Sequence, residues 1–300
     1  EIQRKTRGEQ VAAGPSSASW YRVIGGSQGT MGIVTWSSAR CEMLPRLEEP
    51  FMVGSSQLDR IMEMVHWLIR LRIPNECFVL NGTSLATIMA GGDPQRYLKM
   101  RQDLPPWILF YNLAGYEYFP EERVRVHETD VRGIAQKAQL EPARSAGSVS
   151  AFELLKKVQE PSGDFYWKQP NGWNCQEIFF ISNFQKVDEL IKYMQDISAG
   201  AGYNTENMGV YVQPIVQGVN FHVEFDLYYE LANMVEAETV RKLSVSAVKK
   251  LMDKGAFFSR PYGESARAIL NRDAAMVQAL KKVKTILDPD NVMNPGKLCF

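Results

Sequence analysis

The chain has 300 residues, of which 34 are basic and 34 acidic, so its formal net charge is zero. Because nucleic-acid binding requires clustered positive charge, this balance argues against a nucleic-acid partner. The chain has no run of about 18 apolar residues that would span a bilayer, and its charged N-terminus is unlike a secretion signal. The four cysteines lack C-x-x-C spacing, which indicates reduced thiols in a cytoplasmic protein rather than a disulfide framework or a metal site.

The first elements in chain order form a short N-terminal piece. Residues 1–19 are small and polar, which predicts a loop or a weak hairpin. The glycine-rich stretch GGSQGTMGIVT, Gly25 to Thr35, follows. It leads into an alternating segment, Ile33 to Pro45, that predicts a strand. The pattern changes after this segment, so we place a domain boundary near residue 46.

The middle of the chain contains the same order of elements twice. The first copy has predicted strands at 51–54, 76–82 and 107–117 and predicted helices at 55–73, capped by Ser56, and 94–104. The second copy has predicted strands at 177–183, 208–218 and 219–230, the last two joined as a hairpin at Gly218, and helices at 184–202 and 237–255. Two such copies favour a duplicated α+β layer with a largely antiparallel sheet and helices on one side.

Three further segments complete the prediction. Residues 129–163 are less patterned and predict one helix with surface loops. The aromatic-rich stretch Phe165 to Asn174 is typical of core or interface, with a pocket for a planar substrate as the alternative. Residues 271–289 predict a helix that stops at Pro289, before the tight tail DNVMNPGKLCF.

Two motifs at opposite ends of the chain resemble the same family. The stretch GGSQGTMGIVTWSSARCEMLP resembles the second half of the flavin-binding domain in the vanillyl-alcohol oxidase / p-cresol methylhydroxylase superfamily. The segment ILDPDNVMNPGKLCF resembles the tail of these FAD-linked oxidases. The resemblance implies an α+β fold: a duplicated, ferredoxin-like cap beside a remnant of an α+β FAD-binding domain. It assigns residues 1–46 to that remnant, 47–284 to the substrate-binding cap and 285–300 to a tail returning to the flavin domain.

The resemblance implies FAD as the cofactor and the glycine-rich stretch as part of its binding site. Backbone N–H groups would be offered to FAD by a loop whose glycines allow close approach, and the strand that follows would run along the flavin. The residues given this role are Gly26, Ser27, Gly29, Thr30, Gly32, Ile33 and Val34, with Asn294 of the tail nearby. The alternative for the glycine-rich stretch is a plain turn between strands, and the Asn-Pro turn needs no cofactor to explain it.

The segment FFSRPYG, Phe257 to Gly263, is the first candidate for catalysis. By family position it lies over the flavin. Arg260 would pair with a substrate carboxylate or stabilise a phenolate or the reduced flavin, and Tyr262 would hydrogen-bond the substrate oxygen. The alternative is an arginine in a surface ion pair beside a Pro-Tyr turn.

The segment GVNFHVEFD is the second candidate. On a strand, Asn220, His222, Glu224 and Asp226 project from one face. Asn220 and His222 match part of a G-D-G-N-x-H element in the 2-hydroxy-acid branch, which implies Asn220 as a substrate contact. His222 is a candidate general base. With three histidines in the chain we predict no histidine-based metal site. A histidine satisfied by a neighbour in the cap sheet is the alternative.

The resulting prediction is an FAD-linked oxidase or dehydrogenase. A hydride would pass to flavin N5 from a phenolic or benzylic substrate, favoured by Arg-Pro-Tyr, or from a 2-hydroxy acid, favoured by Asn-x-His. Relatives carry a pyrophosphate-binding half ahead of the glycine-rich stretch, so we expect a missing N-terminal half or a complementing chain as partner. An electron-acceptor protein and a second copy of the chain are further partners to consider. The alternatives are a non-catalytic cap or partner subunit, and a ferredoxin-like ligand-binding regulator.

Overall fold

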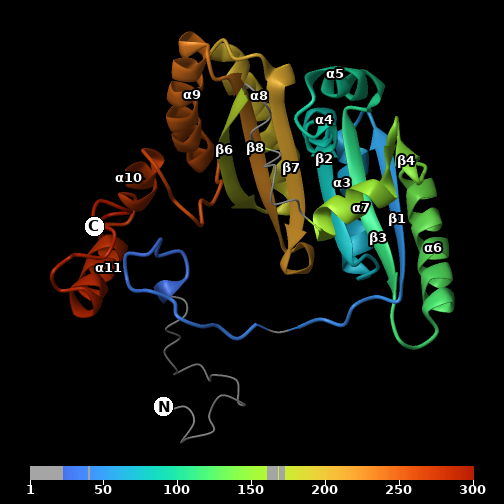
Figure 1. Ribbon diagram of the computed structural model, residues 1–300, viewed down its shortest axis with the longest axis horizontal. Helices are drawn as coiled ribbons and strands as arrows, with labels where there is room; N and C mark the ends of the chain where they lie inside the picture. Colours follow the sequence, from blue (N-terminus) through green and yellow to red (C-terminus); the bar gives the residue numbers. More distant parts are fainter. Residues whose placement is uncertain (1–22, 40, 161–167, 169–172) are drawn as a thin grey trace, which may run out of the picture. The chain divides into compact units, whose positions relative to one another are not determined.

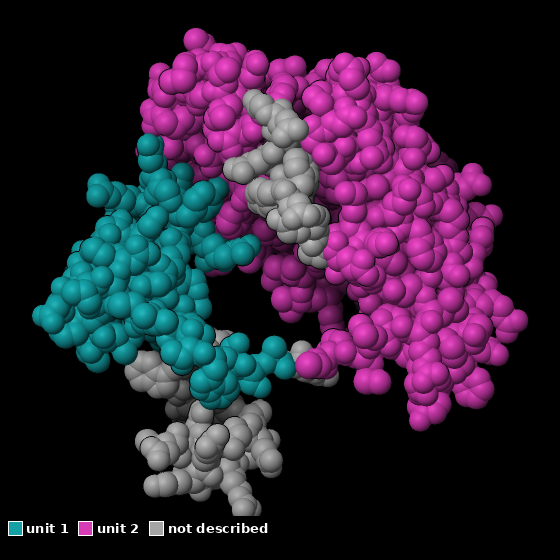
Figure 2. Space-filling view, viewed as in Figure 1, with its two compact units in different colours: residues 1–39, 259–300 teal, residues 40–258 magenta. Residues whose placement is uncertain are grey.

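The structure is a computed structural model, and it describes residues 23–39, 41–160, 168 and 173–300. Its contacts divide the chain into two compact units (Figure 2). Unit 1 comprises residues 1–39 and 259–300, and unit 2 comprises residues 40–258. The observed units therefore differ from the ranges expected for the flavin-domain remnant, cap and tail, and the functional assignment of those ranges stays a prediction.

Unit 2 is built around one six-stranded sheet with the strand order β1-β3-β2-β7-β8-β6 (Figure 1). All its neighbouring strands are antiparallel. The strands are β1 (Leu47–Ser55), β2 (Glu76–Asn81), β3 (Trp107–Gly115), β6 (Trp173–Ser182), β7 (Met208–Ile215) and β8 (Asn220–Glu230). The helices associated with the sheet are α3 (Leu58–Arg70), α4 (Gly82–Ala90), α5 (Pro94–Asp103), α6 (Pro120–Lys137), α7 (Ala151–Gln159), α8 (Val187–Gly200) and α9 (Met234–Asp253).

The predicted duplication is confirmed. One repeat runs β1, α3, β2, β3, α6 and the other runs β6, α8, β7, β8, α9, and they join where β2 pairs with β7. Helices α3 and α6 pack on β1 and β3, and α9 packs on β6 and β8 with α8 beside it. The α+β fold class with a largely antiparallel sheet is thus the observed one.

The first repeat contains further helices. Helix α4, which the sequence patterns did not predict, and the predicted α5 lie between β2 and β3. Helix α7 lies within residues 129–163, for which one helix was expected, and follows a small hairpin of β4 (Ser145–Ala146) and β5 (Val149–Ser150). These helices close an apolar core with Phe78, Leu80 and Phe110 of the sheet. In the second repeat a single 3₁₀ turn, Val216–Gly218, joins β7 directly to β8. The cap at α3 also differs, since Gln57 rather than Ser56 occupies the N-cap.

The same face of the sheet has opposite chemistry in the two repeats. In the first repeat Met52 and Phe110 lie opposite each other on β1 and β3 and belong to the apolar core. In the second repeat Glu177 and Asp226 lie opposite each other on β6 and β8. Tyr211 of β7, which packs against the apolar core, marks the boundary between the two halves. The polar half of this face is where the candidate residues of unit 2 lie.

Unit 1 contains the glycine-rich loop, α10 (Ser265–Leu270) and α11 (Ala274–Leu287), which ends two residues before Pro289, close to the predicted end. The strand predicted over Ile33–Pro45 is wrong for its described residues, which have no regular structure. Its side chains are exposed, Ile33 to 80% and Trp36 to 76%. No described strand pairs with this segment, and a strand without a partner leaves its backbone groups unpaired. Among the described helices of both units, none has the length and apolar character of a membrane span.

Candidate functional site

The glycine-rich loop of unit 1 is closed by its own hydrogen bonds. The amide of Ser27 donates to the carbonyl of Ile24 at 3.0 Å, and the amide of Thr30 donates to the carbonyl of Ser27 at 3.1 Å. The Thr30 hydroxyl donates to the same carbonyl at 2.7 Å. These two amides therefore shape the loop, and the contact of Ser27 and Thr30 with FAD stays a prediction.

The glycines of the loop leave its backbone without side chains that would block a flat cofactor from approaching. Gly26 has φ near +80°, and a Cβ built on it or on Gly32 would meet nothing within 4 Å. A Cβ on Gly29 would lie 3.8 Å from the side-chain nitrogen of Asn294. The space beside Gly26 and Gly32 fits a bound cofactor at this loop. Ile33 and Val34, which follow, are exposed and free of any strand.

The two end motifs of the chain meet in unit 1. The side-chain amide of Asn294 donates to the carbonyl of Gln28 at 2.7 Å. The ammonium of Lys284 on α11 donates to the carbonyl of Thr30 at 2.7 Å and to that of Met293 at 2.9 Å. The tail therefore holds the glycine-rich loop, and Asn294 contacts the loop itself.

A buried ion pair supports this junction. Lys284 also pairs with Asp288, and both residues are 5% exposed. The Asp288 carboxylate accepts the amide of Val292 at 3.0 Å and that of Met293 at 2.8 Å. The hydrogen bond from Lys284, followed by those from the backbone, lowers the pKa of Asp288 below its ordinary value. The sequence prediction missed both residues, although Lys-x-x-x-Asp at the end of a helix is a signal for such a pair.

The segment with Arg260 and Tyr262 also belongs to unit 1. The side-chain amide of Gln28 donates to the carbonyl of Pro261, so this segment is bonded to the glycine-rich loop. Arg260 is exposed and Tyr262 is 39% exposed. The structure thus brings the first catalytic candidates next to the loop assigned to the flavin.

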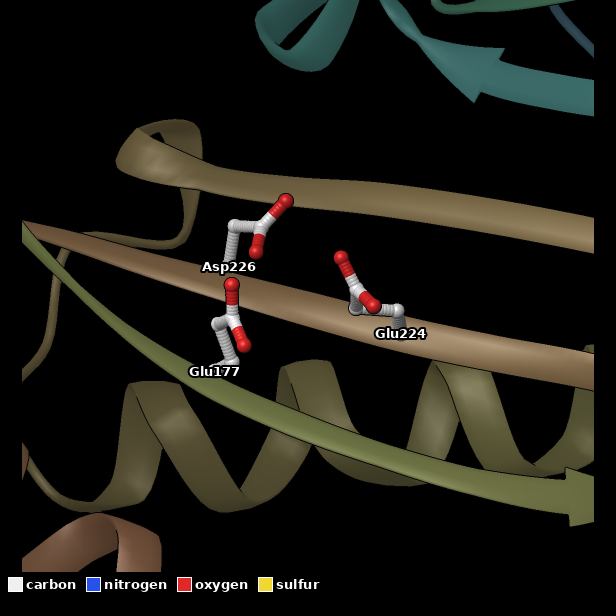
Figure 3. Close-up of side chains that lie close together, drawn as sticks. All are labelled: Glu177, Glu224 and Asp226. Atoms are coloured by element: carbon white, nitrogen blue, oxygen red, sulfur yellow. The ribbon is translucent and has the colours of Figure 1, made fainter. Parts of the chain in front are cut away.

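The second set of candidates lies on β8 in unit 2. His222, Glu224 and Asp226 alternate along the strand and share one face, as predicted. Glu177 of β6 lies opposite Asp226, and Figure 3 shows these carboxylates pointing toward one another. Asn220 is the first residue of β8 and is half-buried. Arg260 and Tyr262 belong to unit 1, and the candidates on β8 belong to unit 2.

Lys168 contacts all three carboxylates. Its ammonium lies 2.7 Å from a carboxylate oxygen of Glu177 and 3.5 Å from one of Asp226, and it hydrogen-bonds Glu224. The lysine is 8% exposed. Burial alone would lower its pKa, but Asp226 and Glu224 outweigh burial and raise the pKa above its ordinary value. Lys168 belongs to the aromatic-rich stretch Phe165–Asn174, of which only Lys168, Trp173 and Asn174 are among the described residues, so the predicted role of that stretch lies outside them.

His222 and Glu224 form a hydrogen-bonded pair. The Nε2 atom of His222 lies 3.1 Å from a carboxylate oxygen of Glu224. Burial would raise the pKa of Glu224, but the hydrogen bond with His222 and the charge of Lys168 outweigh it and lower the pKa. An ionised Glu224 holds the proton on Nε2, which leaves Nδ1 as the basic nitrogen. The imidazole packs between the rings of Phe179 and Tyr211, each 5.9 Å away between centroids.

Asp226 is the most buried member of the group. It is 0% exposed, one oxygen lies 3.6 Å from the sulfur of Cys175, and the other has no hydrogen-bond partner among the described residues. Burial raises the pKa of Asp226 to about 7, against the opposing charge of Lys168. Ionisation of Asp226 is therefore less favourable than that of Glu224, which lies on the same face of β8.

The three carboxylates have the spacing of a metal site. Their oxygens lie within 4.8 Å of one another, and they are the group of this kind found in the described part of the chain. The ammonium of Lys168 contacts all three and neutralises part of their charge. Divalent metal would have to compete with this lysine, so the arrangement fits a salt-bridge cluster better than a metal centre.

A cavity of about 560 Å³ adjoins this cluster. Glu224 and Lys168 lie at its polar side, with Tyr211 and Gln213 of β7 beside them. Leu154 of α7 belongs to its apolar side. The cavity has room for a small organic molecule in contact with the charged cluster.

Comparison with known proteins gives one family-model match near the C-terminus and a relative that aligns over most of the chain. Residues 266–298 match the model of the FAD linked oxidases, C-terminal domain. A D-2-hydroxyglutarate dehydrogenase of Stutzerimonas stutzeri (strain A1501) is 22% identical over 279 residues, which are 91% of this chain and 57% of that protein. The chain spans about half the length of the relatives that it matches.

Two solved structures have the same fold. The 4-ethylphenol oxidase from Gulosibacter chungangensis, in complex with isoeugenol, matches with a TM-score of 0.66 and 15% identity, covering 84% of this chain and 54% of that one. A p-cresol methylhydroxylase with bound substrate matches with a TM-score of 0.64 and 15% identity, covering 85% and 53%. The family model that matches residues 266–298 is that of FAD-linked oxidases, in agreement with the predicted cofactor and enzyme class. The C-terminal segment is thus similar to the C-terminal domain of FAD linked oxidases, and the chain has the fold of these two solved enzymes.

Proposed function

We propose that the chain contributes to an FAD-dependent oxidation of an uncharged alcohol or benzylic substrate. When bound, FAD supplies the acceptor for the hydride that leaves the substrate carbon. His222 takes the proton of the substrate hydroxyl, so that the C–O single bond becomes a carbonyl as the C–H bond breaks. For unit 1 we propose separately that Arg260 and Tyr262 stabilise negative charge on a bound substrate or on the reduced flavin.

The pairing of His222 with Glu224 supports the role of base. An ionised Glu224 orients the ring and stabilises the imidazolium that forms when His222 accepts a proton. The distance of 3.1 Å between Nε2 and the carboxylate is that of an ordinary hydrogen bond. Lys168 holds Glu224 in place from the other side.

The charge of the cluster is the reason for proposing an uncharged substrate. Lys168 is the cation of the cluster, and it contacts three carboxylates. The site in unit 2 therefore has an excess of negative charge at neutral pH, which repels a dicarboxylate. A phenolic or benzylic alcohol meets no such penalty.

A 2-hydroxy acid is the second candidate. It is favoured by the relative named D-2-hydroxyglutarate dehydrogenase and by Asn220 and His222, which match the element of the 2-hydroxy-acid branch. In that case Arg260 supplies the partner for the substrate carboxylate, since a guanidinium can bind it with two hydrogen bonds.

Anaerobic bleaching of the flavin tests the proposal. The flavin-loaded enzyme that contains this chain is mixed with 4-hydroxybenzyl alcohol or with D-2-hydroxyglutarate, and flavin absorbance is followed. We expect the alcohol to reduce the flavin and His222→Gln to slow that reduction by about 10²–10⁴-fold. His66→Gln on α3 is the matched control and keeps the wild-type rate. Reduction by the diacid alone would select the second candidate, and reduction by neither would reject both.

The pyrophosphate part of the cofactor site is a separate proposal. We propose that its contacts come from a further polypeptide segment, a missing N-terminal half or a complementing chain. Charge-assisted hydrogen bonds contribute about 1.5–3 kcal/mol each, so the 300-residue chain by itself should bind FAD weakly. Stoichiometric flavin in the purified chain would contradict this expectation.

A further inference from the structure

Tyr211 of β7 connects the cavity of about 560 Å³ with the proposed base. Its side chain belongs to the wall of that cavity. Its ring also packs edge-on against the imidazole of His222, with 5.9 Å between the ring centroids and 63° between the planes. Glu224, which hydrogen-bonds His222, lies directly opposite Tyr211 on β8 and belongs to the same wall. Two wall residues, Tyr211 and Glu224, therefore contact His222.

The charged groups of this wall are satisfied without a ligand. Lys168 and Glu224 hydrogen-bond each other. The carboxylate of Glu76 accepts a hydrogen bond of 2.8 Å from the side-chain amide of Asn112. Lys157 of α7 is exposed, so its ammonium can stay in water. A ligand in the cavity therefore gains its polar contacts most readily from neutral side chains.

The hydroxyl of Tyr211 is such a neutral group. Tyr211 is half-buried, and its hydroxyl has no hydrogen-bond partner among the residues that the structure describes. Its oxygen is accessible, unlike the enclosed oxygen of Asp226 that also lacks a partner. Burial, with the charge of Glu224, raises the pKa of Tyr211 above its ordinary value, so the hydroxyl keeps its proton. Tyr211 can therefore donate a hydrogen bond to a molecule in the cavity.

The position of this donor beside the base gives it a role in the reaction. We infer that the hydroxyl of Tyr211 donates a hydrogen bond to the substrate oxygen whose proton His222 removes. The inference rests on the proposed function. As the proton passes to His222 and the hydride leaves the carbon, the C–O bond becomes a carbonyl, and Tyr211 keeps its own proton throughout. A donor at this oxygen stabilises the negative charge that develops on it. The carbonyl product accepts the same hydrogen bond.

Gln213 is the neighbouring candidate for this hydrogen bond. It lies directly opposite His222 and belongs to the same wall. Its side chain is exposed and has three torsions to fix. The ring of Tyr211 is already held, because it packs against both Phe78 and His222. Ordering Tyr211 on a ligand therefore costs less conformational entropy than ordering Gln213.

Two matched ligands test the contact without turnover. The full 300-residue chain, without flavin, is titrated in a calorimeter with 4-hydroxybenzaldehyde, the oxidation product of 4-hydroxybenzyl alcohol. It is also titrated with 4-methylphenol, which lacks the carbonyl oxygen. We expect Tyr211→Phe to bind the aldehyde about tenfold more weakly than wild type and 4-methylphenol equally well. Gln213→Met, and Tyr193→Phe on α8, are the controls and should bind both ligands as wild type does.

The rate of flavin reduction tests the same contact during the reaction. In the flavin-loaded enzyme that contains this chain, Tyr211→Phe should slow anaerobic reduction by 4-hydroxybenzyl alcohol by about 10²-fold. Tyr193→Phe should keep the wild-type rate. An unchanged rate in Tyr211→Phe would exclude the hydroxyl from the reaction.

The titrations separate this inference from the proposed oxidation. If neither ligand binds the wild-type chain up to its solubility limit, the inference is overturned. It is also overturned if Tyr211→Phe weakens both ligands equally, since the ring would then act only through the shape of the cavity. A loss of aldehyde affinity in Gln213→Met alone assigns the hydrogen bond to Gln213 instead. If the titrations behave as expected but no alcohol reduces the flavin, the proposed oxidation is rejected, and with it the role of Tyr211 in that reaction.

Discussion

The ammonium of Lys284 donates a hydrogen bond of 2.7 Å to the carbonyl of Thr30, from the last turn of α11 to the glycine-rich loop. The two residues are 254 positions apart in the chain. This bond, with that from Asn294 to Gln28, brings the two distant motifs together in unit 1. The glycine-rich loop uses the amides of Ser27 and Thr30 for its own hydrogen bonds, and the buried Lys284 holds it in place.

Loss of Lys284 is expected to release the loop. Lys284→Met removes the bonds to Thr30 and Met293 and leaves Asp288 buried without its cation, which is unfavourable. We expect a lower thermal midpoint for unit 1 and weaker FAD binding, measured by calorimetry and flavin fluorescence. Lys282→Met, at an exposed position of the same helix, is the control. Equal behaviour of the two variants would show that the buried lysine does not hold the loop.

The Gly26→Ala variant is expected to lose folding stability through backbone strain and, as a separate effect, to lose affinity for FAD. A side chain at φ near +80° costs about 1 kcal/mol of folding stability. Gly202→Ala is a matched control, because Gly202 has φ near +78° and is equally open, but lies in unit 2. Both variants should lose similar stability in urea denaturation, and only Gly26→Ala should bind FAD more weakly. If both retain FAD binding, the loop does not contact the cofactor.

Arg260→Ala is expected to affect the reaction more than the cofactor. Arg260 is bonded through its neighbour Pro261 to Gln28 of the loop, and its guanidinium is proposed to act on the substrate or the reduced flavin. In the flavin-loaded enzyme we expect flavin reduction to slow by about 10²-fold or more, with little change in FAD affinity. Arg267→Ala on α10 serves for comparison. Unchanged reduction would remove Arg260 from the mechanism.

Lys168→Met is expected to convert the salt-bridge cluster into a metal-binding group. Removal of the cation leaves three close carboxylates, which destabilises unit 2 by about 3–5 kcal/mol. Manganese(II) should then raise the thermal midpoint of the variant, because the oxygens of Glu177, Glu224 and Asp226 lie within 4.8 Å of one another. The wild-type chain and Lys192→Met, which removes a surface pair on α8, should show no such rise. A variant unaffected by manganese would show that the cluster is too narrow or too constrained for an ion.

The buried Asp226 is expected to make the stability of unit 2 depend on pH. Burial raises its pKa from an ordinary 3.8 to about 7 in the folded state. Its contribution to stability is therefore fully present below about pH 4 and is lost as the pH rises to about 7, because ionisation in the folded state is unfavourable there.

Comparison with Asp226→Asn isolates this effect. Each pKa unit corresponds to about 1.4 kcal/mol, and the shift is about three units, so the variant should gain on the order of 4 kcal/mol relative to wild type between pH 4 and pH 8. Asp188→Asn, in a surface pair on α8, should show no gain of this size. Free energies of unfolding at several pH values provide the measurement, and a constant difference across the range would contradict the assigned pKa.

The sequence predicted the repeated order of strands and helices because hydrophobic periodicity is a local property. Helix α3 and strand β8 follow the 3.6-residue and two-residue patterns closely, since polar side chains are concentrated on one face of each element and apolar ones on the other. Helix α4 escaped prediction because eight of its nine residues are buried, so it has no polar face to give a period.

The strand expected over Ile33–Pro45 was predicted from its local pattern but did not form. Its alternation is that of a strand, but the described residues contain no neighbour with which it pairs. The local pattern indicates a preference for extended backbone, whereas a strand in a sheet also needs hydrogen bonds with a second strand.

The sequence by itself determined the family resemblance, the duplicated α+β organisation and the shared face of His222, Glu224 and Asp226. Only the tertiary structure decided that Lys168 and Glu177 join this face and that Lys284 holds the loop at Thr30. The physical reason is that the pairing of β6 with β8 and the docking of α11 bring together residues that are far apart in the chain. Periodicity tells which side of an element a residue occupies, and the partner across the contact is set by the fold.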